Sequence, residues 1–244
     1  MRIKSAFSKI CLVFIVMVGG VASSKADQND DYSSGVIPSS PRPFPEQFKD
    51  YQILPTSISP DKQYALIYPK RSVLYDLEEF SLYLVALNPF RILTIIPLYW
   101  TNLTRNSHGS YEVKWSKDSS AVIVVEGSKW GPSKSFLVTI KKGYAGSITD
   151  LTDHIRFEVI DGFWKSKAEP FNAAFDILFS GVNEMDFLNS NQIQINYECT
   201  SDPKSLKKRP WDVRFEGVWD IPKGVFTSKR IIPVPPISPE PSQK

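Results

Sequence analysis

The sequence predicts an all-β protein whose core, residues 49–232, contains about three antiparallel sheets. Short segments such as 111–115 and 193–197 alternate apolar with polar residues, which is typical of strands that bury one face. Few windows keep the helical period of about 3.6 residues. A turn motif that contains aspartate also recurs before two of the predicted strands. These observations favour serially connected hairpins over a helical fold.

The first 26 residues have the features of a secretory signal peptide. Three basic residues precede an apolar run at residues 10–18, and small residues follow up to Ala26. The run is much shorter than the ~20 residues that span a bilayer, so we favour cleavage after Ala26 over a membrane anchor. No second stretch of transmembrane length follows in the sequence. We therefore expect an exported protein, periplasmic or extracellular.

Proline-rich segments flank the predicted core. Residues 27–48 are rich in aspartate, serine and proline, and the tail at residues 233–244 contains five prolines. Such segments cannot bury enough apolar surface to offset the entropy lost on ordering. We expect both flanks to be disordered.

The charge of the chain depends on this processing. Four of its 29 basic residues lie in the predicted signal peptide, so the mature chain would carry 25 basic and 26 acidic residues, a net charge of −1. Its charge therefore gives no support for nucleic-acid binding, and we expect none. Cleavage would also remove Cys11 and leave Cys199 unpaired. We interpret Cys199 as a half-buried thiol at a strand end, with a reactive thiol or an intermolecular bridge as alternatives.

The predicted strands fall into three groups along the core. The groups are residues 64–68 and 82–87, then 111–115, 121–126 and 136–140, then 193–197, 213–219 and 225–232. Residues 121–125 are apolar throughout, which indicates a strand covered on both faces. Residues 75–80 and 171–175 suggest short helical turns. Residues 153–185 are interpreted as a longer join with additional strand material, in which His154 ends a strand.

The first two groups share a turn. Ser59, Pro60 and Asp61 form it in the first group, and Ser116, Lys117 and Asp118 form it in the second. Serine bonds the backbone at the first position, proline presets φ at the second, and aspartate suits the third. These residues are therefore interpreted as structural. Residues 187–191, which precede the third group, are interpreted as a divergent copy of this turn.

The motif at 58–61 and 115–118, followed by an apolar strand, resembles the blade repeat of TolB-like and dipeptidyl-peptidase-type β-propellers. The glycine usual in that family after the aspartate is Lys62 in one unit and Ser119 in the other, and Lys117 replaces the proline. The resemblance implies blade-like sheets. It implies no catalytic residue, because the motif is structural in that family.

The number of sheets predicts a partial or degenerate β-propeller, since propellers typically have about four to eight blades. Either a degenerate fourth sheet lies in residues 153–185, or the flanks cover the free edges, or a partner completes the assembly. We favour the first two over the third. A β-sandwich is the alternative fold.

The sequence contains no recognisable catalytic or metal-binding motif. It lacks the Gly-x-Ser-x-Gly nucleophile elbow and a phosphate-binding loop, and its two histidines, His108 and His154, are far apart and away from cysteine. We therefore predict no catalytic residue, no metal site and no cofactor.

Three features could mark a binding surface. Trp130 lies between two predicted strands, where tryptophan can anchor a ligand but more often covers the sheet. Lys204, Lys207, Lys208 and Arg209 precede Trp211, a cluster that is also compatible with a solvated loop. Asn102-Leu103-Thr104 would be a glycan acceptor in a eukaryotic secretory pathway.

Three functions compete on these features. The favoured hypothesis is a non-catalytic exported module of the bacterial cell envelope or secretome that binds a protein or an envelope polymer. A secreted hydrolase would need two carboxylates about 5–10 Å apart in one cleft. A carbohydrate-binding module would present flat, exposed rings at Trp130, Trp164 or Tyr144.

Overall fold

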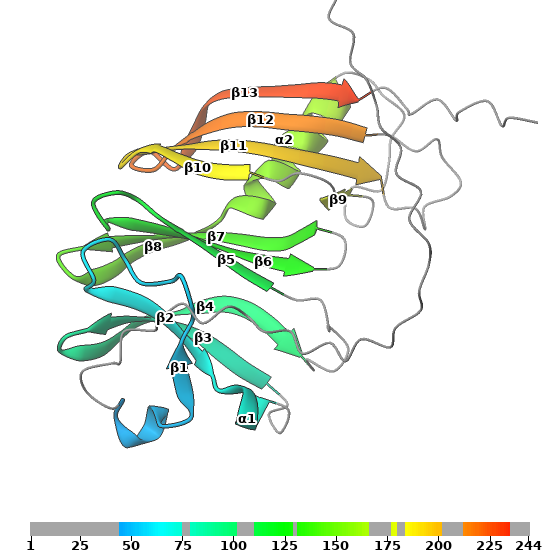
Figure 1. The fold of residues 1–244 in the computed structure, drawn as a ribbon. Coiled ribbons are helices and arrows are strands. Elements are labelled where there is room, and N and C mark those ends of the chain that lie inside the picture. Colours follow the sequence, from blue (N-terminus) through cyan, green and yellow to red (C-terminus); the bar gives the residue numbers. More distant parts are fainter. Residues whose placement is uncertain are drawn as a thin grey trace, which may run out of the picture. The chain divides into compact units, whose positions relative to one another are not determined.

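The computed structural model describes residues 44–74, 79–101, 110–128, 131–165, 177–179, 184–201 and 212–234. These residues form three antiparallel sheets (Figure 1). Sheet 1 contains β1 (Tyr51–Ile53), β2 (Tyr64–Pro69), β3 (Glu79–Leu87) and β4 (Phe90–Thr101). Sheet 2 contains β5 (Ser110–Trp115), β6 (Ala121–Ser128), β7 (Gly131–Lys141) and β8 (Tyr144–Asp150). Sheet 3 contains β10 (Glu184–Asn189), β11 (Gln192–Ser201), β12 (Asp212–Asp220) and β13 (Val225–Val234), with the short β9 (Ile177–Phe179) paired to β11.

Within each sheet, the four main strands follow one another in chain order, each antiparallel to the next. The prediction of an all-β protein with three blade-like antiparallel sheets is confirmed. Helices are few among the described residues: the single turns η1 (Glu46–Phe48) and α1 (Arg71–Leu74), and the longer α2 (Leu151–Lys165).

The sheets stack face to face, and β6 shows why. Val122 and Val124 pack against sheet 1, while Ala121 and Ile123, which point to the opposite face, pack against α2 and sheet 3. All four side chains are buried. The prediction that 121–125 is covered on both faces is therefore confirmed for these four residues, because sheet 2 lies between two neighbours.

The two ends of the stack differ in chemistry. The outer face of sheet 1 is apolar, and Phe48 of η1 covers it by packing on Ile67 and Val85 and against the rings of Tyr51 and Tyr83. The outer face of sheet 3 is polar and carries the ion pairs Arg214–Glu198 and Arg230–Glu216. A polar outer face allows a stack of sheets to end without another layer.

One of the three alternatives, a degenerate fourth sheet in residues 153–185, is not observed in the described part of that segment. Residues 151–165 form α2 instead of strands, and β9 extends sheet 3. Leu151, Ile155 and Val159 recur every four residues, so they lie on one helix face and are fully buried between sheets 2 and 3. Packing against two sheets decided the conformation of this segment.

The two expected helical turns and the expected position of His154 can also be compared with the structure. The expected helical turn at 75–80 is not observed at its described end, because Phe80 lies within β3, and the short α1 comes earlier. His154 lies in α2 rather than at a strand end, with its ring 4.7 Å from that of Trp219. Residues 75–78 and the second expected helical turn, 171–175, lie outside the described residues.

Candidate functional site: the turn edge

Six connections lie together at one edge of the stacked sheets, which we call the turn edge (left in Figure 1). They join β1 to β2, β3 to β4, β5 to β6, β7 to β8, β10 to β11 and β12 to β13. Hydrogen bonds connect sheet 1 to sheet 2 here. The amide of Asp61 donates to Ser119 Oγ at 3.2 Å, and Arg91 Nη2 donates to the carbonyl of Gly143 at 2.6 Å.

The β1–β2 turn is held by Ser59 and Asp61. Ser59 Oγ donates to Asp61 Oδ1 at 2.6 Å and accepts the amide of Tyr64 at 2.9 Å. The amide of Gln63 donates to the same carboxylate oxygen at 3.1 Å. The side chains therefore satisfy backbone groups that the turn leaves unpaired.

The β5–β6 turn repeats this arrangement. Ser116 Oγ donates to Asp118 Oδ1 at 2.8 Å and accepts the amide of Ala121 at 2.9 Å. Lys62 and Ser119, the residues after the two aspartates, both have φ of 59°. This is the left-handed region that glycine enters without strain, and glycine stands there in the family that the motif resembles.

Asp118 also connects the corner of sheet 2 to sheet 3. Burial opposes ionisation of its carboxyl group, but the hydroxyls of Ser190, Ser120 and Ser116 and the amide of Ser120 hold its pKa well below the usual range. Ser190 belongs to the β10–β11 turn. Contacts between turns, which we call corner contacts, therefore connect sheet 1 to sheet 2 and sheet 2 to sheet 3.

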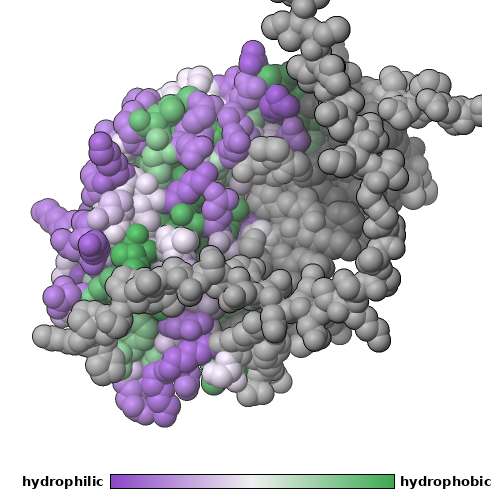
Figure 2. Space-filling model, viewed as in Figure 1, coloured by the Kyte–Doolittle hydropathy of each residue, from purple (hydrophilic) through white to green (hydrophobic). Residues whose placement is uncertain are grey.

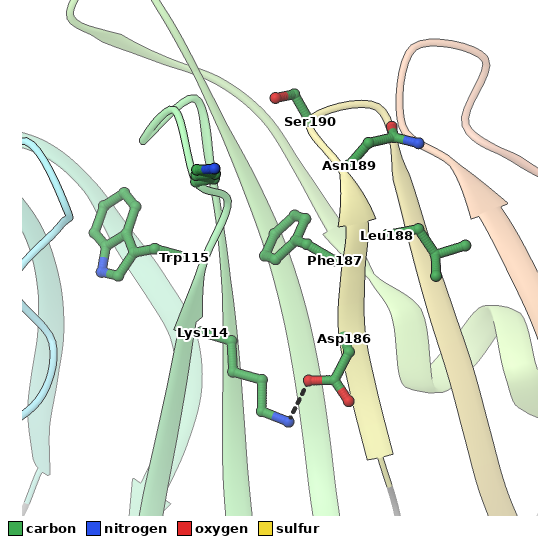
Figure 3. Close-up of a pocket in the computed structure, with 8 residues that line it drawn as sticks. Lys114, Trp115, Asp186, Phe187, Leu188, Asn189 and Ser190 are labelled. Carbon is green, nitrogen blue, oxygen red and sulfur yellow. Dashed lines mark hydrogen bonds and ion pairs between the residues drawn. The ribbon is translucent and has the colours of Figure 1, made fainter.

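Two open hollows flank the β10–β11 turn. The first, about 700 Å³, lies between β5 and β10 and is lined by Lys114, Trp115, Lys117 and residues 186–190. Figure 3 shows Phe187 pointing from β10 toward β5 and Trp115 pointing away from the hollow. The second, about 610 Å³, is lined by residues 189–192 and by Asp220, Pro222 and Lys223. Asn189 and Ser190 border both, so the hollows form one continuous surface.

An ion-pair cluster closes one side of the first hollow. Lys114 Nζ lies 2.9 Å from Asp186 Oδ1 and 3.2 Å from Glu112 Oε1, so the two carboxylates flank one ammonium group (Figure 3 shows the pair with Asp186). Burial opposes the charge on Lys114, but hydrogen bonds and the charges of both acids raise its pKa. The cluster connects sheets 2 and 3.

The turn edge carries more positive than negative charge. Its six connections contain two aspartates, Asp61 and Asp118, and four cations, Lys62, Lys117, Lys142 and Lys223. One further aspartate and two further cations lie at the adjoining strand ends: Asp220 in β12, Arg91 in β4 and Lys141 in β7. Among the described residues, Lys62, Lys117, Lys141 and Lys142 form no ion pair, whereas Lys223 bonds Asp220 at 2.9 Å. In Figure 2, hydrophilic residues predominate along this side, and hydrophobic ones form small separate areas.

The structure leaves most of the predicted binding residues undescribed. Trp130, and the cluster of Lys207, Lys208, Arg209 and Trp211 with Lys204, lie outside the described residues. So does the glycan acceptor at 102–104. Trp164 lies in α2, but its side chain is likewise outside what the structure describes. Tyr144 is 63% exposed, and Arg91 Cζ lies 4.1 Å from the centre of its ring.

The residues of the turn edge gave no pattern in the sequence. Lys62, Lys117, Lys142 and Lys223 occur singly or in pairs in turns spread over about 160 residues, and only the stacking of the sheets collects them. Asn189 and Asn191 were visible only as part of the divergent turn at 187–191. Its geometry is an Asx turn, in which the amide of Asn191 donates to Asn189 Oδ1 at 2.8 Å.

Cys199 lies in the core rather than at a surface. Its side chain is fully buried in β11 among residues of sheet 3 and α2, not half-buried as predicted. Burial raises the pKa of the thiol to about 12, with a smaller opposing effect from Arg156. A thiol that stays protonated and inaccessible is a poor nucleophile, so the structure favours a packing role.

Comparison of the chain with protein-family models, with curated proteins and with solved structures finds no match in any of the three. The described residues contain no helix that is long and apolar enough to cross a membrane. They also contain no group of three or more His, Cys, Asp or Glu side chains placed to hold a metal ion.

Proposed function

We propose that this protein is an exported, non-catalytic binding module that recognises its ligand along the turn edge. The observation that carries the proposal is the continuity of this surface. Corner contacts hold the turns of three successive sheets together, and two hollows meet at the β10–β11 turn. Turns held by a rigid stack of sheets are a common way to build a binding surface.

Two further features support the proposal. The aspartates that repeat along the chain, Asp61 and Asp118, hold turns together through serine hydroxyls and backbone amides. The signal-peptide pattern of the first 26 residues supports export. The resemblance to TolB-like propeller blades stays a prediction, and it is compatible with a binding role.

Export is tested by expressing the chain with its own N-terminus in a Gram-negative host. We expect the protein in the periplasm or medium, with Asp27 as the first residue on N-terminal sequencing. Retention of residues 1–26 on a cytoplasmic product would contradict export.

Binding is tested by exposing the processed, immobilised protein to envelope extract. Leu188 is 55% exposed and lines the first hollow, whereas Phe157 is 70% exposed on α2. We expect Leu188→Asp to abolish stoichiometric capture and Phe157→Asp to preserve it, because only Leu188 faces the proposed surface. Equal capture by both variants would contradict the turn edge as the site.

A secreted hydrolase is the second candidate, and one observation favours it. Glu112 and Asp186 flank Lys114 beside the first hollow, so two carboxylates lie near one open surface. The test is turnover of peptide, ester and glycoside substrates by the protein and by Asp186→Asn. Activity that this variant loses would support the hydrolase and contradict the binding module.

A further inference from the structure

We propose that the ligand of the turn edge is an acidic polysaccharide, a sugar polymer whose negative charges are carboxylates. The inference rests on the proposed function and names the chemistry of the ligand at the same site. It follows from three properties of the turn edge: its charge, its length and the side chains between its cations.

The charge of the turn edge differs in sign from that of the expected mature chain. Six cations and three aspartates lie in or beside the six connections, and at the first hollow Lys114 is paired with Asp186 and Glu112. The chain after cleavage would have a net charge of −1. Two of the aspartates, Asp61 and Asp118, direct carboxylate oxygens into hydrogen bonds within their own turns. Lys62, Lys117, Lys141 and Lys142 have no ion pair among the described residues and are exposed. This arrangement favours a negatively charged ligand.

The cations are distributed over a length that suits a polymer. Lys62 lies on sheet 1, Lys117, Lys141 and Lys142 on sheet 2, and Lys223 on sheet 3. Stacked sheets lie about 10 Å apart, so cations on three successive sheets span roughly 20 Å. A small anion would contact one sheet only. A linear polyanion can contact all three at once.

The side chains between the cations favour a sugar polymer. Asn189, Ser190, Asn191 and Gln192 line the hollows between Lys117 and Lys223, and amide and hydroxyl groups are donors and acceptors suited to sugar hydroxyls. Proteins that bind single-stranded nucleic acids combine cations along the backbone with free aromatic rings on which the bases stack. At the turn edge, the exposed ring of Tyr144 is covered on one face by Arg91.

The experiment measures binding of the processed protein to alginate, a soluble polymer of uronic acids, at low and at high salt. Dextran, poly-glutamate and single-stranded DNA serve as comparison ligands. We expect alginate to bind, dextran not to bind, and affinity to fall severalfold between about 0.05 and 0.3 M NaCl, because exposed charges are screened. Poly-glutamate and DNA should bind more weakly than alginate, because they lack the sugar hydroxyls.

Two triple variants distinguish binding at the turn edge from attraction to the positive charge of the protein as a whole. Lys62→Gln, Lys117→Gln and Lys142→Gln together remove three cations from the turn edge. Lys49→Gln, Lys70→Gln and Lys229→Gln remove the same charge elsewhere. We expect the first triple to weaken alginate binding at least tenfold and the second to leave it within twofold. Circular dichroism and thermal unfolding of both triples verify folding.

Several results would overturn the inference. These are no binding to alginate, equal losses in both triples, or tighter binding to poly-glutamate or DNA than to alginate. Capture from envelope extract that depends on Leu188, without alginate binding, would overturn the ligand class while the binding module stands. Failure of both measurements would overturn the two proposals together.

Discussion

Lys62 and Ser119 occupy equivalent positions in two turns, and both have φ of 59°. A non-glycine residue in this region costs about 1–2 kcal/mol. The turns keep this conformation because serine and aspartate side chains bond the backbone on both sides of it. Of the two side chains, Ser119 also bonds the neighbouring sheet, since its Oγ accepts the amide of Asp61.

These two positions give a matched prediction. Lys62→Gly should raise the free energy of unfolding by about 0.5–1 kcal/mol, because glycine relieves the strained φ and loses little else. Ser119→Gly relieves the same strain but removes a hydrogen bond of about 0.5–1.5 kcal/mol, so it should give no gain. Urea unfolding of the two variants measures the difference. Equal gains would show that the bond between the sheets contributes nothing.

Asp118 predicts how stability responds to acid. Because its pKa is lowered in the folded protein, its carboxylate stabilises the fold above about pH 4, near the unfolded pKa, and this stability is lost as the pH falls toward the folded pKa. Asp118→Asn should therefore have a lower free energy of unfolding than the parent at pH 7. This difference should become smaller between about pH 5 and pH 2. Chemical unfolding at a series of pH values checks this.

Ser190→Ala serves as the control for that measurement. Among the interactions that lower the pKa of Asp118, the bond to the Ser190 hydroxyl is the largest, so its removal should flatten the pH dependence only in part. If the difference in unfolding free energy between Asp118→Asn and the parent stayed constant with pH, the lowered pKa of Asp118 would be contradicted.

At the scale of elements, α2 shows how a helix can replace expected strands. Its apolar face, Leu151, Ile155 and Val159, fits between sheets 2 and 3, and Asp150 caps its first turn by accepting the amide of Asp153 at 3.0 Å. Gly162 lies where α2 approaches β13. A Cβ at this position would lie 2.3 Å from Cδ1 of Ile231.

This close approach predicts a coupled pair of substitutions. Gly162→Ala alone should be neutral or destabilising, since the clash with Ile231 offsets a gain in helix propensity of about 1 kcal/mol. In an Ile231→Val background, which lacks Cδ1, the same change should stabilise the fold by about 0.5–1 kcal/mol. A double-mutant cycle measures the coupling. Additive effects would show that Ile231 moves aside at no cost.

At the scale of the whole molecule, the described sheets form a series in which sheet 2 alone lies between two other sheets. Apolar side chains on both faces of β6 therefore contribute to the core, whereas β12 has one buried and one polar face. The polar outer face of sheet 3 and the cover that Phe48 provides on sheet 1 explain how the stack ends without closing a ring.

The two faces of β6 can be tested separately. Ile123→Ala should cost about 2–5 kcal/mol of unfolding free energy, and Val124→Ala, on the opposite face, about 2 kcal/mol, because each leaves a cavity between two sheets. Val218→Ala on the outer face of β12 should cost less than about 1 kcal/mol. Urea unfolding gives all three values. A small cost at either β6 position would contradict close packing on that face.

The sequence alone determined the features that depend on neighbouring residues. Alternation identified the strands at 111–115, 193–197 and 213–216, the apolar stretch at 121–125 identified the strand covered on both faces, and the Ser–x–Asp pattern located the turns at 59–61 and 116–118. These features are local because side-chain period and turn hydrogen bonding involve residues a few positions apart.

The tertiary structure decided what depends on distant contacts. Residues 151–165 became a helix because two sheets cover their Leu151–Ile155–Val159 face, a stripe that strand-like aromatic residues masked in the sequence. The turn edge likewise exists only because stacking places Lys62, Lys117 and Lys223 along one edge of the sheets. Local sequence carries no information on such neighbours, since the free energy that joins them comes from burial between sheets.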